Sequence, residues 1–254
     1  MKHRIVIGAC TAGLLFAFQS AAFAAAANPP AYVTAAVADP HRPKTDTNRD
    51  ADRTPAVMLG FSGVKPGDKV AELIPAGGYA TRLLSAAVGP NGHIYSINLD
   101  TLNDNIKAQI KPVTDDPAYA NVSVSNQVLG ELKTPEPVDM VWTSQNYHDF
   151  KNPGMFFADT VAMDKAIFAA LKPGGLYIII DHVAAAGSGT RDTGTLHRID
   201  PETVKAEVLS AGFVLEGESK DLASSSDPHT ARVPGAGNIG DKSDKFFFKF
   251  RKPR

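Results

Sequence analysis

Short runs of β-branched and aromatic residues alternate with helical patterns from Thr54 to the end of the chain. The clearest run covers residues 176–181, where a continuous Tyr-Ile-Ile-Ile is typical of a strand buried on both faces. Such alternation predicts crossover units that build a mostly parallel sheet with helices on both faces. Turn signals delimit seven expected strands, at residues 69–74, 93–99, 121–128, 138–143, 176–181, 213–220 and 245–250.

Three helices are expected between these strands. Apolar residues recur at helical spacing before Gly89, which stands where a C-cap glycine would. A second helix is expected over residues 154–171, because Pro173 cannot continue it. A third begins at Asp200-Pro201-Glu202, which combines an N-cap carboxylate, a proline at the first helical position and an acid in the first turn. These elements predict one α/β domain over residues 54–254.

Residues 1–24 have the three-part layout of a secretory signal peptide. Two basic residues precede an apolar run, which leads to the small-residue site Ala22-Phe23-Ala24. A transmembrane anchor is the alternative, but the run is shorter than the roughly 20 apolar residues that span a bilayer. Too few apolar residues precede Cys10 for a lipoprotein signal. We therefore expect cleavage, export to the periplasm or the medium, and no stable membrane anchor afterwards.

The segment between the signal peptide and the expected domain, residues 25–53, is rich in Ala, Pro, Asp and Arg. It shows no sustained apolar period, which is typical of a flexible or loosely packed segment. The chain is thus expected to consist of a signal peptide, this flexible lead-in and one folded domain.

Composition limits the chemistry and the partners of the exported chain. Cys10 is the only cysteine, so the chain after cleavage has neither a disulfide nor a thiol nucleophile. The signal peptide holds two of the 26 basic residues, which leaves 24 basic against 27 acidic ones. No basic block of the kind that binds nucleic acid or anionic membranes is present. The expected partner is a small molecule, and the sequence does not indicate an oligomeric state.

The turn after the first expected strand, Glu72-Leu-Ile-Pro-Ala-Gly-Gly-Tyr, resembles the first motif of class I S-adenosylmethionine-dependent methyltransferases. In that family an acid ends the strand, and a glycine-rich loop opens a helix around the methionine part of the cofactor. Glycines let the backbone approach a ligand, and a helix N-terminus offers free N–H donors. The family pattern acid-x-G-x-G-x-G places Ile74 and Ala76 at the first two glycine positions, keeps Gly78 and adds Gly77. The resemblance implies cofactor contacts at Glu72, Gly77 and Gly78.

The second expected strand resembles the family strand that ends in an acid bound to both ribose hydroxyls. Asn98 stands in place of that acid. An amide oxygen accepts hydrogen bonds but lacks the charge of a carboxylate. Asp100, two residues further, points to the same side of an extended chain and is a substitute contact. The resemblance therefore adds Asn98 and Asp100 to the cofactor site.

Further similarity extends the resemblance over residues 70–250. The stretch Leu171-Lys-Pro-Gly-Gly-Leu-Tyr-Ile-Ile-Ile-Asp is close to the family's entry to strand five, and Ala211-Gly-Phe-Val-Leu to its entry to strand six. The whole implies a Rossmann-like, seven-stranded sheet. Ser144-Gln-Asn-Tyr-His-Asp, Gly194-Thr-Leu-His-Arg-Ile-Asp and the closing Phe-Arg-Lys-Pro also resemble a group of exported bacterial proteins known only as predicted methyltransferases, whose substrate is not established.

Side chains that follow the fourth and fifth expected strands are the candidates for chemistry, because ligands of open α/β sheets bind outside the carboxyl ends of the strands. His148 could take a proton from an O or N nucleophile near neutral pH. Tyr147 and Asp149 flank it and complete the expected catalytic set. Expected substrate contacts are Asn146, Asp181, His182 and His197.

Two other functions stay open at this point. His148, Asp149, Asp181, His182 and His197 are N and O ligands of the kind that bind zinc or iron, although no compact spacing supports a metal site. An exported, non-catalytic protein that binds a small ligand on the same fold is the other alternative. Export away from the cytoplasm, where the cofactor is made, and the two replaced glycines favour this last reading over catalysis.

Overall fold

A seven-stranded sheet forms the centre of the computed structural model, which describes residues 29–153, 156–233 and 240–254. The strand order is β3-β2-β1-β4-β5-β7-β6, and only β7 runs antiparallel to its neighbours. The seven expected strands are confirmed, within a few residues at their ends. Their bounds are β1 Lys69–Leu73, β2 His93–Leu99, β3 Val122–Gln127, β4 Val138–Ser144, β5 Leu171–His182, β6 Val214–Ser219 and β7 Lys245–Arg251.

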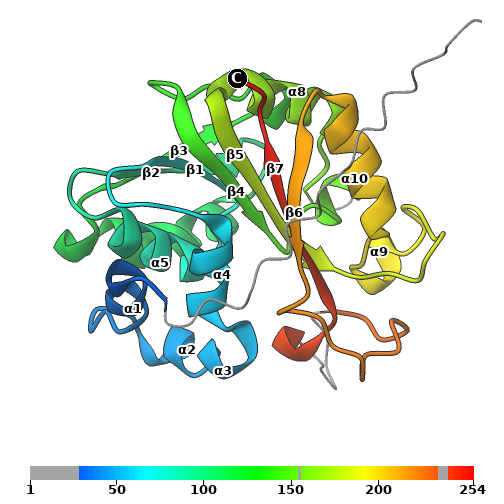
Figure 1. Ribbon diagram of the computed structural model, residues 1–254, viewed down its shortest axis with the longest axis horizontal. Coiled ribbons are helices and arrows are strands. Elements are labelled where there is room, and N and C mark those ends of the chain that lie inside the picture. The colour runs from blue at the N-terminus through cyan, green and yellow to red at the C-terminus, as the bar shows by residue number, and fades with distance from the viewer. Residues whose placement is uncertain (1–28, 154–155, 234–239) are drawn as a thin grey trace, which may run out of the picture.

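Helices cover both faces of the sheet, as expected (Figure 1). One face carries α1 Ala31–Val37, α4 Pro55–Ser62 and α5 Tyr79–Val88, with α2 Lys44–Thr47 and α3 Asp50–Arg53 beside them. The other carries α8 Thr160–Ala170, α9 Thr193–Leu196 and α10 Pro201–Ser210. The remaining short elements are α6 Asp104–Lys107, α7 Lys111–Thr114, η1 Ala108–Ile110, η2 Pro117–Tyr119, η3 Leu129–Glu131, η4 Asp149–Lys151 and η5 Gly240–Lys242.

Strand β5 shows how the sequence produces two separate cores. Tyr177 and Ile179 pack into the core under α8 and α10, whereas Ile178 and Ile180 pack into the core under α1, α4 and α5. Successive side chains of a strand point to opposite faces. A continuous apolar run therefore fills both cores at once, which explains why this strand lacks the alternation of a half-exposed one.

The lead-in differs from the flexible segment expected from the sequence. From residue 31 to 53 it forms α1, α2 and α3, and Val33 and Ala36 are buried in the same core as α5. Arg42 is also buried and forms a bidentate pair with Asp50, at 2.6 and 2.8 Å. The segment lacks an apolar period because charged contacts, rather than an apolar stripe, hold α2 and α3.

Helix boundaries follow the capping residues. Asp200 accepts from the backbone N–H of Glu202, so the expected N-cap of α10 is confirmed. Helix α8 begins later than expected, because Asp159 caps it through the N–H groups of Val161 and Ala162. Gly154, the expected start, lies outside the described residues.

Within the described ranges, no helix combines the length and apolarity needed to cross a bilayer. The expected signal peptide also lies outside these ranges.

Candidate functional site

The loop between β1 and α5 keeps the backbone path of a glycine-rich loop. Ile74, Ala76 and Gly78 all have left-handed backbones, with φ of 52°, 47° and 81°. These are the three positions that the family pattern fills with glycine. A β-branched residue in this region is strained and persists only where the surrounding structure imposes it. The loop thus has the backbone that favours glycine at three positions, although Ile and Ala occupy two of them.

The two glycines of the loop meet different surroundings. A Cβ on Gly78 would lie 2.4 Å from Val113 Cγ2, whereas a Cβ on Gly77 would have no atom within 4 Å. Gly78 is therefore required by packing and by its positive φ. Gly77 faces open space in the cleft described below, so its missing side chain leaves room for a ligand.

We expect Gly78→Ala to lower the free energy of unfolding by about 2–3 kcal/mol, through the left-handed backbone and the contact with Val113. Gly77→Ala is the matched control and should leave stability near wild type. Chemical denaturation of both variants measures the difference. Equal stabilities of the two variants would contradict this account of the loop.

A cleft of about 360 Å³ opens at the carboxyl ends of β1 and β4. It is bounded by the loop after β1, by the segment after β4 and by α2 and α3. Its lining includes the expected residues Glu72, Gly77 and Asn146. Ser144, a candidate at the end of the fourth strand, also lines it, and the residues that the sequence did not indicate are Thr45, Asp46, Arg49, Arg53 and Gln145. The lead-in is therefore part of the wall of this site.

Glu72 ends β1 as a buried carboxyl group. Its Oε2 accepts hydrogen bonds from Thr81 Oγ1 at 2.6 Å and Ser96 Oγ at 3.2 Å. Burial raises the pKa of Glu72 to about 7, against the opposing effect of these hydroxyl donors. The side chain thus joins the loop, the start of α5 and strand β2.

The free energy of unfolding should fall as pH rises from about 4.5 to about 7, because Glu72 keeps its proton more tightly in the folded state. Its contribution is complete below the unfolded pKa and is lost as pH passes the folded one. Over this window we expect a decrease of about 2–3 kcal/mol. Glu72→Gln removes this contribution, so denaturation of both proteins at pH 5 and pH 8 isolates it. A difference between them that does not change with pH would contradict the prediction.

Asn98 and Asp100 have different environments. Asn98 is buried at the end of β2, and its Nδ2 has no hydrogen-bond partner among the residues that the structure describes. Such an unsatisfied buried donor is costly unless a ligand or water completes it. Asp100 lies in the turn after β2, is exposed and does not line the cleft. Of the two residues, only Asn98 has a buried polar atom without a hydrogen-bond partner among the described residues.

Arginines of the lead-in surround Tyr79 at the start of α5. The guanidinium carbons of Arg42, Arg49 and Arg53 lie 5.5, 5.6 and 4.5 Å from the ring centroid. Arg49 and Arg53 both pair with Asp241, each with a shortest distance of 2.6 Å. This partner is remote in sequence, so the Arg-rich composition of residues 42–53 was the only available signal. The two arginines give the cleft a basic wall.

The segment after β4 sends neighbouring side chains in different directions. Asn146 donates to the carbonyl groups of Leu73 and Ile74, at 3.2 and 3.3 Å, and so ties β4 to the loop. Tyr147 is buried on the far side, where its hydroxyl oxygen lies 2.9 Å from carboxyl oxygens of both Asp164 and Glu207. The expected catalytic set is therefore divided, because Tyr147 lies apart from the cluster that His148 and Asp149 form, and none of the three residues lines the cleft.

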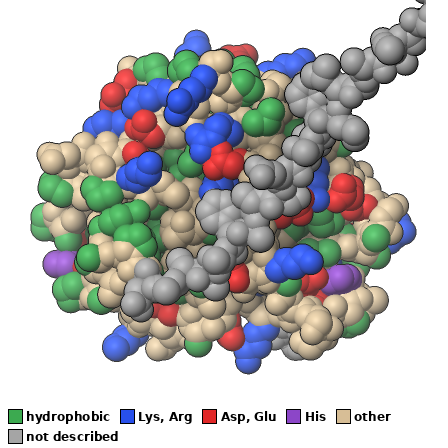
Figure 2. Space-filling view, viewed as in Figure 1, with side chains coloured by type: hydrophobic (Ala, Val, Ile, Leu, Met, Phe, Trp, Pro, Cys, Tyr) green, Lys and Arg blue, Asp and Glu red, His purple; other side chains and the backbone are tan. Residues whose placement is uncertain are grey.

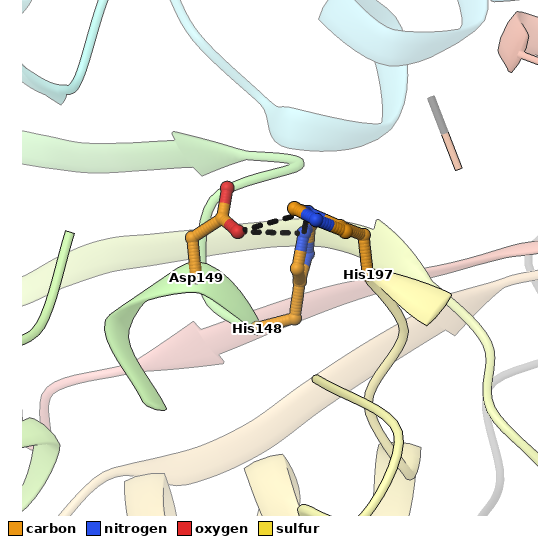
Figure 3. A group of neighbouring side chains, drawn as sticks. All are labelled: His148, Asp149 and His197. Carbon is orange, nitrogen blue, oxygen red and sulfur yellow. Dashed lines mark hydrogen bonds and ion pairs between the residues drawn. The ribbon is translucent and has the colours of Figure 1, made fainter. Parts of the chain in front are cut away.

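His148, Asp149 and His197, the His–Asp–His cluster, meet in one buried place (Figure 3). Asp149 Oδ1 lies 3.2 Å from His148 Nε2 and 3.1 Å from His197 Nδ1. The two nitrogens are 3.4 Å apart. Burial alone lowers the pKa of His148, but the carboxylates of Asp181 and Asp149 outweigh it and raise the value to about 10. A His148 that keeps its proton at neutral pH cannot accept another, which is opposite to the expected role of a base.

Asp181 and His182 lie beside this cluster without belonging to it. Asp181 is fully buried and accepts from the backbone N–H of His148, and its Oδ1 lies 2.7 Å from His148 Nδ1. His182 Nδ1 lies 2.7 Å from Ser243 Oγ, and burial lowers the pKa of this ring. Neither residue lines the cleft. Of the expected substrate contacts, Asp181 and His182 thus lie outside the cleft and outside the cluster, Asn146 lines the cleft and His197 belongs to the cluster.

Comparison with solved structures identifies the fold of the chain. No family model and no curated protein matches the chain. Its sheet order and layers are those of the class I methyltransferase fold. A SAM dependent methyltransferase from Aquifex aeolicus is similar, with 16% identity, a TM-score of 0.59, and coverage of 82% of this chain and 95% of that one.

Two further solved structures agree with this fold. An S-adenosylmethionine dependent methyltransferase from Mesorhizobium loti has 13% identity, a TM-score of 0.54, and coverage of 80% of this chain and 99% of that one. An arsenic (III) S-adenosylmethionine methyltransferase from Chlamydomonas reinhardtii has 14% identity, a TM-score of 0.55, and coverage of 89% and 75%. The likeness covers most of the chain and concerns the arrangement of its elements.

Proposed function

We propose that the protein binds S-adenosylmethionine in the cleft and transfers its methyl group to a small-molecule acceptor. The observation that carries this proposal is the backbone of the loop after β1, left-handed at the three positions that glycine occupies in the family pattern. Strain of this kind concentrates at functional sites. The similar solved structures named above are described as methyltransferases that depend on this cofactor.

The residues of the cleft fit the chemical groups of this cofactor. Although Asn98 does not itself line the cleft, its unpaired amide at the end of β2 is a donor that a ribose oxygen would satisfy. Arg49 and Arg53 supply cationic donors for a carboxylate. The side-chain-free face of Gly77 allows close approach to the backbone. These four residues would hold the ligand, while buried Glu72 supports the loop from behind.

The sulfonium of the bound cofactor supplies an already activated methyl group, so the protein's main task is to position the acceptor. Ser144, Gln145 and Asn146 line the cleft at the end of β4. They offer hydroxyl and amide groups to a polar acceptor. His148 need not act as a general base in this reaction, and its two ring nitrogens face Asp181 and Asp149.

A small acceptor agrees better with the surface than a nucleic acid does. Figure 2 shows acidic and basic side chains mixed over the described part of one face. Several charges among the described residues are paired, for example Lys172 with Asp139 at 2.7 Å. Nucleic-acid binding favours a continuous basic surface, whereas this face is of mixed sign.

Calorimetric titration of residues 25–254 with S-adenosylmethionine and S-adenosylhomocysteine tests the proposal. We expect stoichiometric binding of both, and weaker binding by Gly77→Ala and by Asn98→Leu, which removes the unpaired donor. Absence of heat with either ligand at millimolar concentration would overturn the proposal. Binding without methyl transfer to any acceptor class would instead support the non-catalytic alternative.

We also propose that residues 1–24 direct the protein out of the cytoplasm, as in the exported group that the sequence resembles. The layout of these residues supports the proposal. Fractionation of the expressing cell, with N-terminal sequencing of the exported protein, tests it. A mature chain that starts at Ala25 is expected. An uncleaved chain in the cytoplasm would contradict export.

A further inference from the structure

We infer that the His–Asp–His cluster is a binding site for a divalent transition metal ion, with Zn²⁺ as the best fit. Each of its three residues turns one ligand atom towards the others (Figure 3). Two imidazole nitrogens and a carboxylate oxygen are a common ligand set for zinc. The site is separate from the proposed cofactor cleft, since none of the three residues lines it.

The distances within the cluster match a tetrahedral metal site. Atoms bound at about 2.0–2.1 Å from a tetrahedral zinc ion are about 3.3 Å from one another. The three edges here are 3.1, 3.2 and 3.4 Å. One ion can therefore contact all three atoms from a position slightly off their plane, with a fourth position left for water or substrate.

Hydrogen bonds alone do not account for this arrangement. Asp149 Oδ1 is buried and has no hydrogen bond of acceptable geometry within the described part of the chain, although two ring nitrogens lie close to it. A buried carboxylate oxygen without a hydrogen bond is costly. A metal ion at the centre of the cluster, displacing the Nε2 proton of His148 to solvent, would satisfy this oxygen and both nitrogens together.

The surroundings of His148 are those of a metal-bound histidine. Asp181 lies 2.7 Å from its Nδ1 and also accepts from its backbone N–H at 2.8 Å. A carboxylate at the second ring nitrogen fixes the orientation of metal-ligating histidines. By bonding Nδ1, Asp181 orients the ring so that the other nitrogen, Nε2, faces Asp149 and His197. The same carboxylate is a positioning group and not itself a ligand.

Arg232 closes the other side of the cluster. Its NH2 group lies 2.6 Å from His197 Nε2, and a guanidinium can only donate, so the ring proton of His197 lies on Nδ1. Metal binding at Nδ1 would move this proton to Nε2 and turn Arg232 away. Arg232 is exposed and can point to solvent. His197 itself has a left-handed backbone, with φ 53°, which directs its ring into the cluster.

Titration of chelator-treated residues 25–254 with Zn²⁺, Co²⁺ and Mg²⁺ tests the site. We expect one Zn²⁺ per chain, a higher melting temperature with zinc, the strong visible absorption of tetrahedral Co²⁺, and no binding of Mg²⁺, which prefers oxygen ligands. Asp149→Asn and His197→Asn should each weaken zinc binding at least about 100-fold, beyond the 10–100-fold typical of supporting residues. Arg232→Ala should strengthen it.

The control is His41→Asn, the same kind of change at an exposed histidine, which should leave zinc binding unchanged. Circular dichroism of the metal-free variants separates loss of the site from loss of the fold. No zinc uptake by the folded wild-type protein would overturn the inference. Equal zinc affinity in wild type, Asp149→Asn and His197→Asn would overturn it as well, because the ion would then be bound elsewhere.

Discussion

Deletion of the lead-in, so that the chain begins at Thr54, is expected to lower the free energy of unfolding by about 5 kcal/mol or more and to abolish ligand binding. Arg82 is buried and donates to Asp46 at 2.9 Å, so the deletion leaves a buried guanidinium without its partner. Breaking such a pair costs about 3–5 kcal/mol. Loss of the buried Val33 adds about 1.5–3 kcal/mol.

The cleft would lose one of its walls in the same deletion. Thr45, Asp46, Arg49 and Arg53 all belong to the lead-in. Chemical denaturation and calorimetry of the shortened chain measure both effects. A chain that begins at Pro29 keeps every contact described here and is the control. Wild-type stability of the shorter chain would show that residues 29–53 are dispensable, as the sequence alone suggests.

Arg198→Met is expected to destabilise the protein by about 3–5 kcal/mol. Arg198 is fully buried, and its guanidinium donates to the carbonyl groups of Val183 and Ala231, both at 2.9 Å. It also pairs with Asp227 at 2.9 Å, whose side chain is 1% exposed. The substitution leaves this carboxylate buried without a cation, which is the main source of the loss.

Arg191→Met is the matched control for Arg198→Met. Arg191 pairs with Asp192 at 2.9 Å, but its side chain is 67% exposed, so its removal should hardly change stability. Thermal and chemical denaturation compare the two variants. The double variant Arg198→Met with Asp227→Asn should recover part of the loss, because the uncompensated charge is then gone. Equal effects of the two single substitutions would contradict a structural role of Arg198.

Residues 144–149, which comprise the last residue of β4 and the five that follow it, connect the two sites. Ser144, Gln145 and Asn146 face the cleft, and His148 and Asp149 belong to the His–Asp–His cluster. The backbone N–H of Asp149 donates to the carbonyl of Asn146 at 3.0 Å, which fixes one group of residues relative to the other. A metal ion at the cluster would therefore stabilise the segment that lines the acceptor side of the cleft.

The residues of the sheet could be predicted because burial of a strand depends on its own composition. Tyr177 to Ile180 must be buried on two faces wherever they lie, and turn residues on either side delimit them. The same reasoning correctly placed the loop after β1, because a strand that ends in Glu72 and a glycine pair before a helix is a local pattern. Asp200 is a further example, since an N-cap acts on the next few residues only.

Contacts between distant residues decided the rest. The lead-in is ordered by partners outside it. Asp50 accepts a hydrogen bond from Tyr79 at 2.8 Å, and Arg49 pairs with Asp241, 192 positions away. No local sequence pattern predicts such pairs. His197 joins His148 because β4 and β5 are neighbours in the sheet, which brings the segments that follow them together. The sequence by itself determined the seven strands and three of the helices, α5, α8 and α10. Only the tertiary structure decided three features: the left-handed backbone of Ile74 and Ala76, the wall that the lead-in adds to the cleft, and the grouping of His148 with His197. Each depends on contacts between segments that are far apart in the chain.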